Sequence, residues 1–520
     1  LGLGREDIQI HMLPLGGDFG GKGSFMDIPL AYFLARTSGR PVRMTMTYPE
    51  ELMAGNPRHA ATIVVRSGLS RDGRLLARWV RAYFSSGGYA AFKPSTDTTL
   101  PGFRRGAIGP YHVPVHRAEC HMVYTNTVPG GHMRSPGEAQ VAYAIEAHTD
   151  LIARELGMDP IDLRRRNATH EARPAEDDGP DVPPRVADVL DAAARAIGWG
   201  APKPVGVGRG LSLIEFSTSP GIYAGVLRVG RDGRVTIQTP IIEQGAGMHT
   251  VFRRIVAEEL GLPVRQIDIE QSLDDIEEDR GVGGSRTTRL VGKLLIQLSR
   301  RIRSRLADIL AGELGIEAGA VHAIGGGFDV ADGRAFTFEQ TAALLAEPLA
   351  ETLHFRATER DRSVVFIAQA AEVAVDRETG AVMPRRVVTV QEVGRVIDPL
   401  LFRRQIEGGL LQGLGYALME QVVVKDGQVQ NLNLHEYKVP TQADVPLVET
   451  LLVGHDPRLG ITPVGEGANA GLAPAIVNAV MDAIGGHVLD IPLSPEVVRS
   501  IALGDPPRGH AGARHEASRT

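Results

Sequence analysis

Five short segments combine glycine with charged or hydroxyl-bearing residues, and each leads into a stretch with helical spacing. They are residues 16–22 (GGDFGGK), 130–137 (GGHMRSPG), 243–247 (EQGAG), 281–288 (GVGGSRTT) and 464–467 (VGEG). Glycine lets the backbone approach a ligand closely, and a helix that begins after such a loop offers unpaired N–H groups and a positive dipole end. One hydrogen bond to a charged group contributes only about 1.5–3 kcal/mol, so a large anionic cofactor would need several loops that converge.

Each loop taken alone has a simpler explanation as a plain turn or a helix cap. The first loop also imitates a phosphate-binding P-loop, because four residues separate Gly16 from Gly21-Lys22 and the preceding segment Asp7–Met12 alternates like a strand. The next residue is Gly23, where a P-loop needs Ser or Thr to hold Mg²⁺. A nucleotide-binding protein is therefore a weak alternative.

The elements that must position these loops are hairpins mixed with separate helices, which is typical of an α+β fold. Asp-Gly pairs between β-type runs predict four hairpins, at Asp72-Gly73, Asp232-Gly233, Asp332-Gly333 and Asp426-Gly427. Apolar residues at helical spacing predict helices over residues 248–260, 290–309 and 476–484.

Length and composition set the class of protein. At roughly 150 residues per domain, 520 residues favour two to four domains. A net charge of -6 gives no footprint for nucleic acid or anionic lipid. The one cysteine, Cys120, allows no disulfide within the chain, and no apolar run approaches the ~20 residues that span a bilayer. Because the chain starts at Leu1 without a methionine, we expect Leu1 to lie inside a longer polypeptide.

In this order, the loops resemble those of the molybdenum-cofactor-binding large subunits of the xanthine dehydrogenase and aldehyde oxidase family. The resemblance spans Leu3 to about Leu503 and includes a helix motif, Asp398-Pro399 followed by Gln405 and residues 412–415 (QGLG). It implies an α+β fold of two cofactor-binding domains of mixed sheets and helices, with the cofactor between them. The expected boundaries are 1–172 for the first domain, 173–205 for a Pro-rich linker and connecting helix, 206–504 for the second domain and 505–520 for a disordered tail.

The resemblance also implies a molybdenum–molybdopterin cofactor, with or without an added nucleotide. The expected cofactor contacts are Gly17, Phe19, Gly20, Gly21, Arg134, Gly245, Gly247, Gly284, Ser285, Arg286, Gln405 and Gly465. Glu466 is implied as the general base of a reaction that hydroxylates an aldehyde or an N-heteroaromatic carbon with oxygen from water. An isolated loop glutamate is more often a solvated charge or a helix cap, so this assignment depends on the neighbouring motifs.

Three positions depart from the family pattern; the first two bear on the substrate and the third on the hydrogen bonds that hold the cofactor. Gly23 stands where purine-oxidising members carry a glutamate, and Ser135 stands where carbon monoxide dehydrogenases carry a cysteine. Ala246 replaces a glutamine of the third loop. Purine and carbon monoxide are therefore disfavoured as substrates.

Four further residues have two explanations each. His132 and His249 adjoin the predicted cofactor loops, but a lone histidine is more often a hydrogen-bonded structural residue. Arg104 or Arg105 could orient a substrate oxygen, and a surface charge pair is at least as good an explanation.

Partners follow from the electrons that such a reaction releases. A single cysteine cannot hold an iron–sulfur cluster, so by resemblance the electrons pass to a [2Fe–2S] small subunit and an FAD subunit. We expect no nucleic-acid partner, no membrane span and a cytoplasmic location, or a periplasmic one if an export signal lies upstream or on a partner. The leading rival function is a truncated scaffold subunit without turnover.

Overall fold

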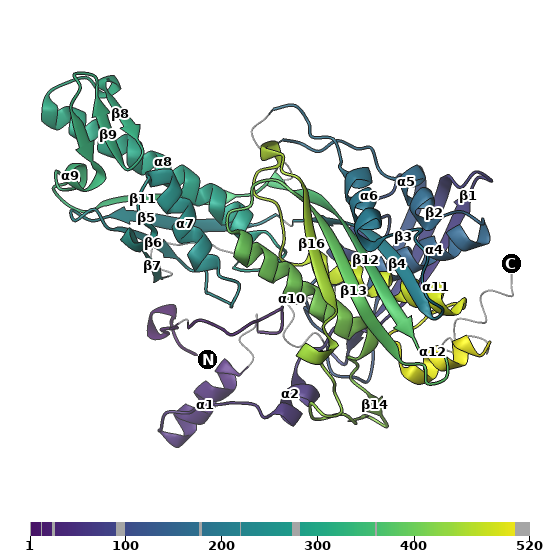
Figure 1. Cartoon of the computed structure of the whole chain (residues 1–520). Coiled ribbons are helices and arrows are strands. Elements are labelled where there is room, and N and C mark those ends of the chain that lie inside the picture. Colours follow the sequence, from purple (N-terminus) through teal and green to yellow (C-terminus); the bar gives the residue numbers. More distant parts are fainter. Residues whose placement is uncertain are drawn as a thin grey trace.

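The computed structural model describes residues 2–11, 13–22, 27–89, 99–175, 179–218, 220–272, 281–358 and 361–504. Gly23 and the predicted tail 505–520 lie outside these residues. Figure 1 shows an elongated molecule, with a lobe around the long helix α8 (Thr287–Leu314) at one end and a larger body around α11 (Gly467–Ile484) at the other. No helix in the described part of the chain is both long and apolar enough to cross a membrane.

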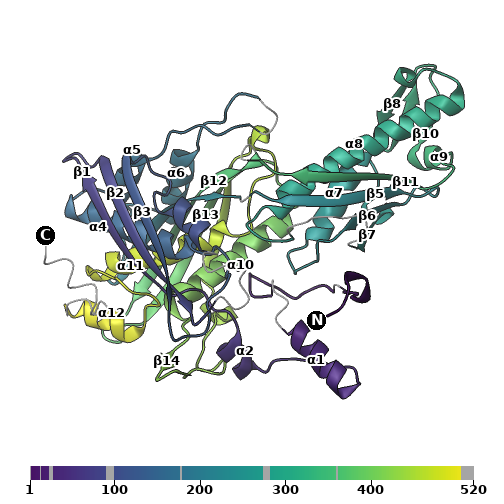
Figure 2. The same ribbon diagram turned by 180° about the vertical axis from the view of Figure 1, so that it is seen from behind.

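The chain begins as an arm whose two helices bury none of their side chains. Its helices are α1 (Ile28–Ser38) and α2 (Tyr48–Ala54), and Figure 2 shows α1 standing apart from both lobes. The strand predicted over Asp7–Met12 is wrong for its described part, because η1 (Arg5–Asp7) is a 3-10 helix and residues 8–11 are irregular. Ile8 and Ile10 are both exposed, so their alternation has no sheet to pack on.

A three-stranded sheet follows, in the order β1-β2-β3. It consists of β1 (Ala61–Leu69), β2 (Leu75–Gly87) and β3 (Val115–Tyr124). The predicted hairpin at Asp72-Gly73 is confirmed, and β3 adds to β2 in parallel. The helices of this region are α3 (Leu100–Gly106), α4 (Glu138–Glu155), α5 (Pro160–Asn167) and α6 (Val186–Ile197).

The lobe around α8 contains a four-stranded mixed sheet in the order β11-β5-β6-β7. Its strands are β5 (Ile222–Val229), β6 (Val235–Thr239), β7 (Ile267–Gln271) and β11 (Leu349–Arg356). Helices α7 (Met248–Leu260) and α8 share one buried apolar cluster with this sheet, which confirms both predicted helices. The remaining elements of the lobe are β8 (Val321–Ile324), β9 (Gly327–Val330), β10 (Ala335–Thr337) and α9 (Phe338–Ala342).

The larger body contains a second mixed sheet, in the order β16-β13-β12-β4. Its strands are β4 (Val207–Ser217), β12 (Val364–Val375), β13 (Val382–Val393) and β16 (Leu447–Gly454). Its other elements are α10 (Pro399–Leu418), α12 (Pro495–Ala502) and the short strands β14 (Val424–Lys425) and β15 (Gln428–Val429). The hairpin predicted at Asp426-Gly427 joins β14 to β15 and is confirmed. In the lobe around α8, the predicted hairpins at Asp232-Gly233, between β5 and β6, and at Asp332-Gly333, between β9 and β10, are confirmed as well.

Helix α11 lies at the centre of the larger body because its small and apolar residues cover all of its faces. It contacts α4, α10, β4 and β12, and its side chains are almost all buried. The predicted helix over 476–484 is its second half. This placement brings the start of α11 against segments from both halves of the chain.

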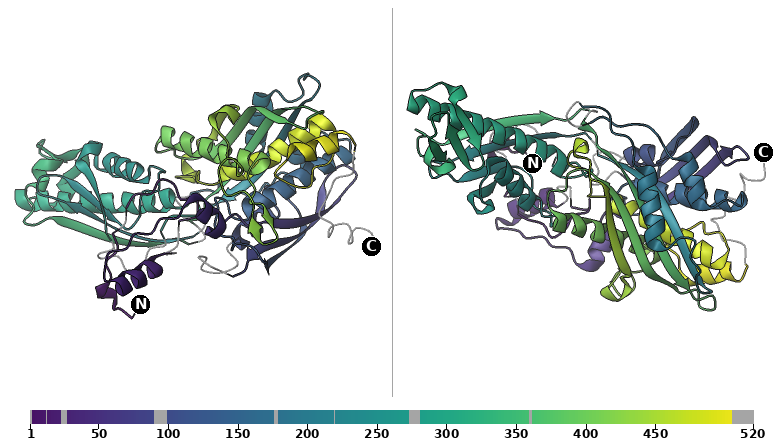
Figure 3. Two further views of the ribbon diagram at one scale, coloured as in Figure 1. Left: turned by 90° about the horizontal axis from the view of Figure 1, so that it is seen from below. Right: turned by 45° about the horizontal axis from the view of Figure 1, so that its top comes forward.

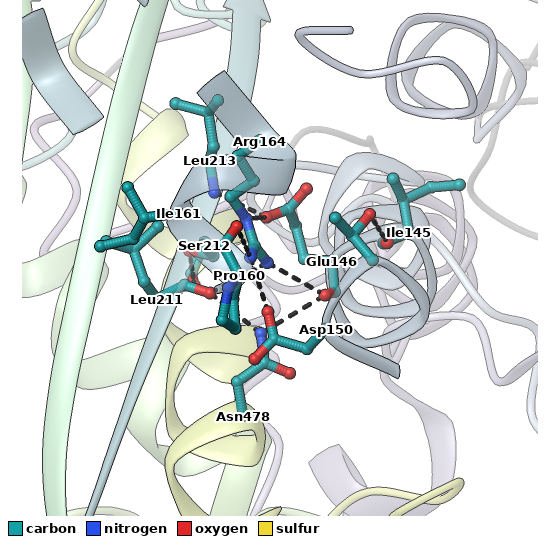
Figure 4. Close-up of polar contacts among 12 residues, drawn as sticks. Ile145, Glu146, Asp150, Pro160, Ile161, Arg164, Leu211, Ser212, Leu213 and Asn478 are labelled. Carbon is teal, nitrogen blue, oxygen red and sulfur yellow. Dashed lines mark hydrogen bonds and ion pairs between the residues drawn. The ribbon is translucent and has the colours of Figure 1, made fainter. Parts of the chain in front are cut away.

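A buried polar cluster fixes α4 and α5 against β4 and α11, as Figure 4 shows. The guanidinium of Arg164 lies 2.9 Å from Glu146 Oε2 and 2.6 Å from Asp150 Oδ1, and it also donates to the carbonyl of Leu211 at 3.2 Å. The side-chain amide of Asn478 donates to the same carbonyl at 2.9 Å. Because these buried polar groups are paired with one another, the cluster fixes how α4 and α5 pack against β4 and α11.

The Pro-rich segment after α5 is also tied to the body. Arg173 and Val182 exchange backbone hydrogen bonds of 2.9 and 2.7 Å. The buried guanidinium of Arg173 pairs with Glu392 of β13 at 2.6 Å. The described part of this segment is therefore fixed to the second sheet.

Candidate active site

Glu466 lies directly before α11, where loops from distant parts of the chain meet. Its Oε1 accepts the backbone N–H of Ser135 at 3.2 Å, and its Oε2 accepts the hydroxyl of Ser285 at 2.8 Å. Its backbone carbonyl accepts the Ser135 hydroxyl at 2.8 Å. The carboxylate thus bridges loops 130–137 and 281–288.

Arg134 fastens the Glu466 loop to α10. Its Nε donates to the carbonyl of Gly465 at 2.6 Å, and its Nη2 donates to the carbonyl of Gln405 at 2.8 Å. Its Nη1 donates to the side chain of Gln412 at 3.3 Å, whereas the side-chain oxygen of Gln405 is at the 3.5 Å limit. Burial lowers the pKa of the Arg134 guanidinium to about 10, and the charge of Glu466 opposes this shift. Figure 3 shows α10 running between the two lobes.

Loop 16–22 packs against loops 130–137 and 243–247. The carbonyl of Phe19 accepts the backbone N–H of Arg134 at 2.7 Å. A Cβ placed on Gly20 would lie 2.7 Å from the Cβ of His132, so only glycine fits there. The N–H of Leu15 donates to the carbonyl of Glu243 at 2.8 Å.

The remaining predicted glycines lie at the same junction. Gly465 approaches Ser285 so closely that an added Cβ would be 2.8 Å from its hydroxyl oxygen. Gly247 is equally restricted by the side chain of Leu401 on α10. Three more of the predicted glycines, Gly17, Gly245 and Gly284, have a positive φ. Gly21, the remaining one, donates its N–H to the carbonyl of Asp18 at 2.9 Å.

Backbone strain is concentrated in these loops. Among the described residues, five that are not glycine have a positive φ, and three of them are Phe19 (54°), Ser135 (60°) and Ser285 (52°). Each such residue costs about 1–3 kcal/mol and persists where the surroundings determine it, often at functional sites. The strained backbone therefore lies in the same loops that meet at Glu466 through hydrogen bonds.

Helices begin directly after the loops, and they differ in whether a side chain already accepts hydrogen bonds from the N–H groups of their first turn. At the start of α7, Glu243 accepts the N–H groups of Gly247 and His249 at 2.9 and 3.1 Å. The residues before α8 and α11, Arg286 and Glu466, make no side-chain cap bond. The starts of α8 and α11 are therefore better placed to receive an anion than the start of α7.

Two residues near the loops have structural partners. The guanidinium of Arg286 contacts the hydroxyl of Tyr223 on β5 and the carbonyl of Pro220, both at 3.0 Å. The ring Nε2 of His249 lies 2.8 Å from the carbonyl of Ile241, which matches the structural explanation for this histidine.

The structure adds site residues that sequence patterns did not single out. Arg58 donates to the carbonyls of Arg134 and Ser135 at 2.8 and 3.3 Å, and Asn469 donates to the former at 2.8 Å. No spacing rule predicts these contacts, because Arg58 and Arg134 are 76 residues apart. Arg105 makes a charge pair, as one of its two explanations expects, but its partner Glu138 is buried and its own side chain is 19% exposed, so the pair is only partly at the surface.

Comparisons with known proteins identify the family of the chain. The family model described as molybdopterin cofactor-binding domain matches twice, over residues 1–168 and 189–446. The chain is 32% identical to a probable xanthine dehydrogenase subunit of Bacillus subtilis (strain 168), over 95% of this chain and 68% of that protein. It is 29% identical to the 6-hydroxypseudooxynicotine dehydrogenase complex subunit gamma of Paenarthrobacter nicotinovorans, over 97% and 68%.

Its fold is similar to that of quinoline 2-oxidoreductase from Pseudomonas putida 86, with a TM-score of 0.86, 23% identity and coverage of 95% of this chain and 68% of that one. The α+β fold with two molybdopterin-binding domains is thus confirmed. The chain belongs to the molybdopterin-dependent oxidoreductases, in the family of the molybdenum-binding subunits of xanthine dehydrogenase and aldehyde oxidoreductase.

Proposed function

We propose that this chain is the cofactor-binding subunit of an enzyme that hydroxylates an aldehyde or an N-heteroaromatic carbon with oxygen from water. The observation that carries the proposal is the placement of Glu466, whose carboxylate is held by Ser135 and Ser285 from two different loops. A positioned carboxylate at such a junction is suited to general base catalysis.

The loops fit a large anionic cofactor. Closely packed glycines leave no room for side chains at Gly20, Gly247 and Gly465, so backbone lines the junction. The uncapped starts of α8 and α11 add N–H groups and positive dipole ends, which favour phosphate. In the proposal the cofactor contacts Gly17, Phe19, Gly20, Gly21, Gly245, Gly247, Gly284, Ser285, Arg286, Gln405 and Gly465. When bound, a molybdenum–molybdopterin cofactor supplies the oxygen that is transferred and accepts two electrons.

Glu466 accepts a proton in the proposed reaction. A carboxylate has about four lone-pair positions, and the two hydrogen bonds from Ser135 and Ser285 leave acceptor capacity on both oxygens. The same two bonds restrict rotation of the carboxylate, so it is oriented before substrate arrives. This pre-organisation avoids part of the entropy cost of reaching the transition state.

Arg134 has a positioning role in the proposal. Its side chain is occupied by acceptors of the protein, and two of these are the carbonyls of Gly465, directly before Glu466, and of Gln405 on α10. Arg134 thereby holds Glu466 in place. A direct contact between Arg134 and the cofactor stays a prediction.

The two electrons leave through partners in the proposal. Cys120 is the only cysteine of the sequence, so the iron–sulfur centres belong to a [2Fe–2S] subunit, followed by an FAD subunit. We also propose that the enzyme is located in the cytoplasm.

The test uses the complex purified with its partner subunits. Molybdenum is measured by elemental analysis, aldehydes and N-heteroaromatics are screened with an artificial electron acceptor, and product is analysed after reaction in ¹⁸O-labelled water. The proposal expects stoichiometric molybdenum and label in the product. Molybdenum without oxidation of either substrate class refutes the proposed reaction, and absence of both metal and turnover favours a scaffold.

A further inference from the structure

A small cavity lies beside the start of α11, between α3, α4 and β4. Its volume is about 20 Å³, which is room for one water molecule. The lining includes three carboxylates, from Glu138, Glu146 and Glu215, and apolar side chains such as Ala142 and Ala470. A cavity of this size is too small for a substrate ring but large enough to connect two acids through water.

The three carboxylates differ in what already binds them. Glu146 already accepts three hydrogen bonds, from the hydroxyl of Tyr111 at 2.5 Å, Nε of Arg164 at 2.9 Å and the N–H of Leu213 at 2.8 Å. Glu138 is 5% exposed and accepts from Nε of Arg105 at 3.0 Å. Within the described residues, Glu215 makes no hydrogen bond through its carboxylate, and its ion pair with Arg362 is loose at 3.9 Å.

Glu138 lies within electrostatic reach of the proposed base, because burial raises the pKa of Glu138 and the charge of Glu466 raises it further. Ser135, which donates to both the carboxylate and the carbonyl of Glu466, stands three residues before Glu138. Ala470, one helical turn after Glu466, lines the same cavity as Glu138. Glu215 lines the same cavity and has a side chain that is 21% exposed, against 5% for Glu138. Solvent therefore reaches Glu215 more readily than Glu138.

We propose that Glu138, one water in this cavity and Glu215 carry the proton from Glu466 to solvent after each turnover. The inference rests on the proposed role of Glu466 as general base. Glu466 gains a proton during hydroxylation and must lose it before the next cycle. The proton passes to the carboxylate of Glu138, then through the water to that of Glu215, and then to bulk water. Each carboxylate returns to its ionised form, and no electron moves along this path.

The charges around the cavity suit carboxylates that exchange protons. Burial raises the pKa of Glu138. The charge of Arg105 opposes this increase, and the charge of Glu466 adds to it. Burial also raises the pKa of Glu215 to about 7. The groups facing Glu215 are Arg362, Arg105 and Arg173, which lower its pKa, and Glu171, which raises it. An acid of this strength both accepts and releases protons near neutral pH.

The test compares Glu215→Gln with Glu171→Gln in the complete enzyme. Glu171 is a matched control, because it is exposed and contributes charge near Glu215 without lining the cavity. Three quantities are measured: the rate of the first substrate-driven reduction by stopped flow, the steady-state kcat, and kcat with added imidazole as a small proton carrier. In the chain without cofactor, the protonated carboxyl band is titrated by infrared spectroscopy.

We expect Glu215→Gln to leave the first reduction and KM unchanged, because one resident base is enough for one turnover. Its kcat should fall by about tenfold or more and recover with imidazole, and a band that titrates near pH 7 should disappear. Glu171→Gln should behave as wild type. An unchanged kcat, an equal loss in the first reduction, or a change confined to KM overturns the proton path. A wild-type enzyme that oxidises no substrate overturns the proposed function instead, and the proton path with it.

Discussion

Replacing Arg134 by methionine removes the clamp that holds Glu466 while keeping a side chain of similar length. The change removes the donors at 2.6 and 2.8 Å from the carbonyls of Gly465 and Gln405. The carbonyl of Gln405 lies inside α10, where a helical N–H also reaches it, so only the carbonyl of Gly465 is left unpaired. One acceptor left unpaired costs about 1–3 kcal/mol, and the free energy of unfolding should fall by that amount. Freed from α10, the Glu466 loop should move, and a displacement of about 1 Å in a catalytic group can cost about 100-fold in rate.

The assay has two parts, and neither depends on activity alone. Urea unfolding gives the stability change, and hydrogen exchange followed by mass spectrometry reports on residues 464–469. We expect faster exchange in this segment for Arg134→Met, with partial recovery in Arg134→Lys, which retains one donor group. Arg286→Met is the control, because its guanidinium contacts Tyr223 and Pro220 instead. Wild-type exchange at 464–469 in Arg134→Met would refute the clamp.

Three further predictions concern the loops and the buried cluster. Gly20→Ala should abolish molybdenum occupancy, because the new Cβ would lie 2.7 Å from the Cβ of His132. The control is Gly39→Ala, which also places alanine at a positive φ but in open space, and it should retain the metal. Equal molybdenum occupancy in both variants would place loop 16–22 away from the cofactor. Ser285→Ala should lower kcat more than it raises KM, because it frees one carboxylate oxygen of Glu466, and the reverse split would contradict this role. Burial raises the pKa of Asp150 from 3.8 to about 6, so its stabilising effect is complete only well below pH 4 and is lost as the pH rises through 6. Relative to Asp150→Asn, wild type should therefore lose about 2 kcal/mol of unfolding free energy between pH 4 and 7, and a constant difference would contradict the shift.

Local rules predicted much of the secondary structure. An Asp-Gly turn specifies a hairpin through backbone geometry alone, and all four such turns join antiparallel strands. The helices over 248–260 and 290–309 follow from apolar spacing because each buries one face in a large cluster. The strand over Asp7–Met12 failed for the opposite reason, since Ile8 and Ile10 meet no partner in the described chain.

The candidate site could be predicted as a set of loops but not as a network. Glycine content marks where backbone must pack closely, and Gly20 and Gly465 do so. The bonds from Arg134 to Gly465 and Gln405 join residues 331 and 271 positions apart, which no local pattern encodes. Arg58 and Glu138 were missed for the same reason: their roles arise only when α10, α4 and α11 are packed together.

The assignment of Glu466 as general base is tested most directly in the complete enzyme carrying Glu466→Gln. Molybdenum content and the rate of substrate-driven reduction are measured on the same preparation. Because a positioned base contributes roughly 10²–10⁴-fold to rate, we expect wild-type molybdenum and a reduction rate at least ~100-fold lower. A variant that keeps its metal and reduces at the wild-type rate would contradict this assignment.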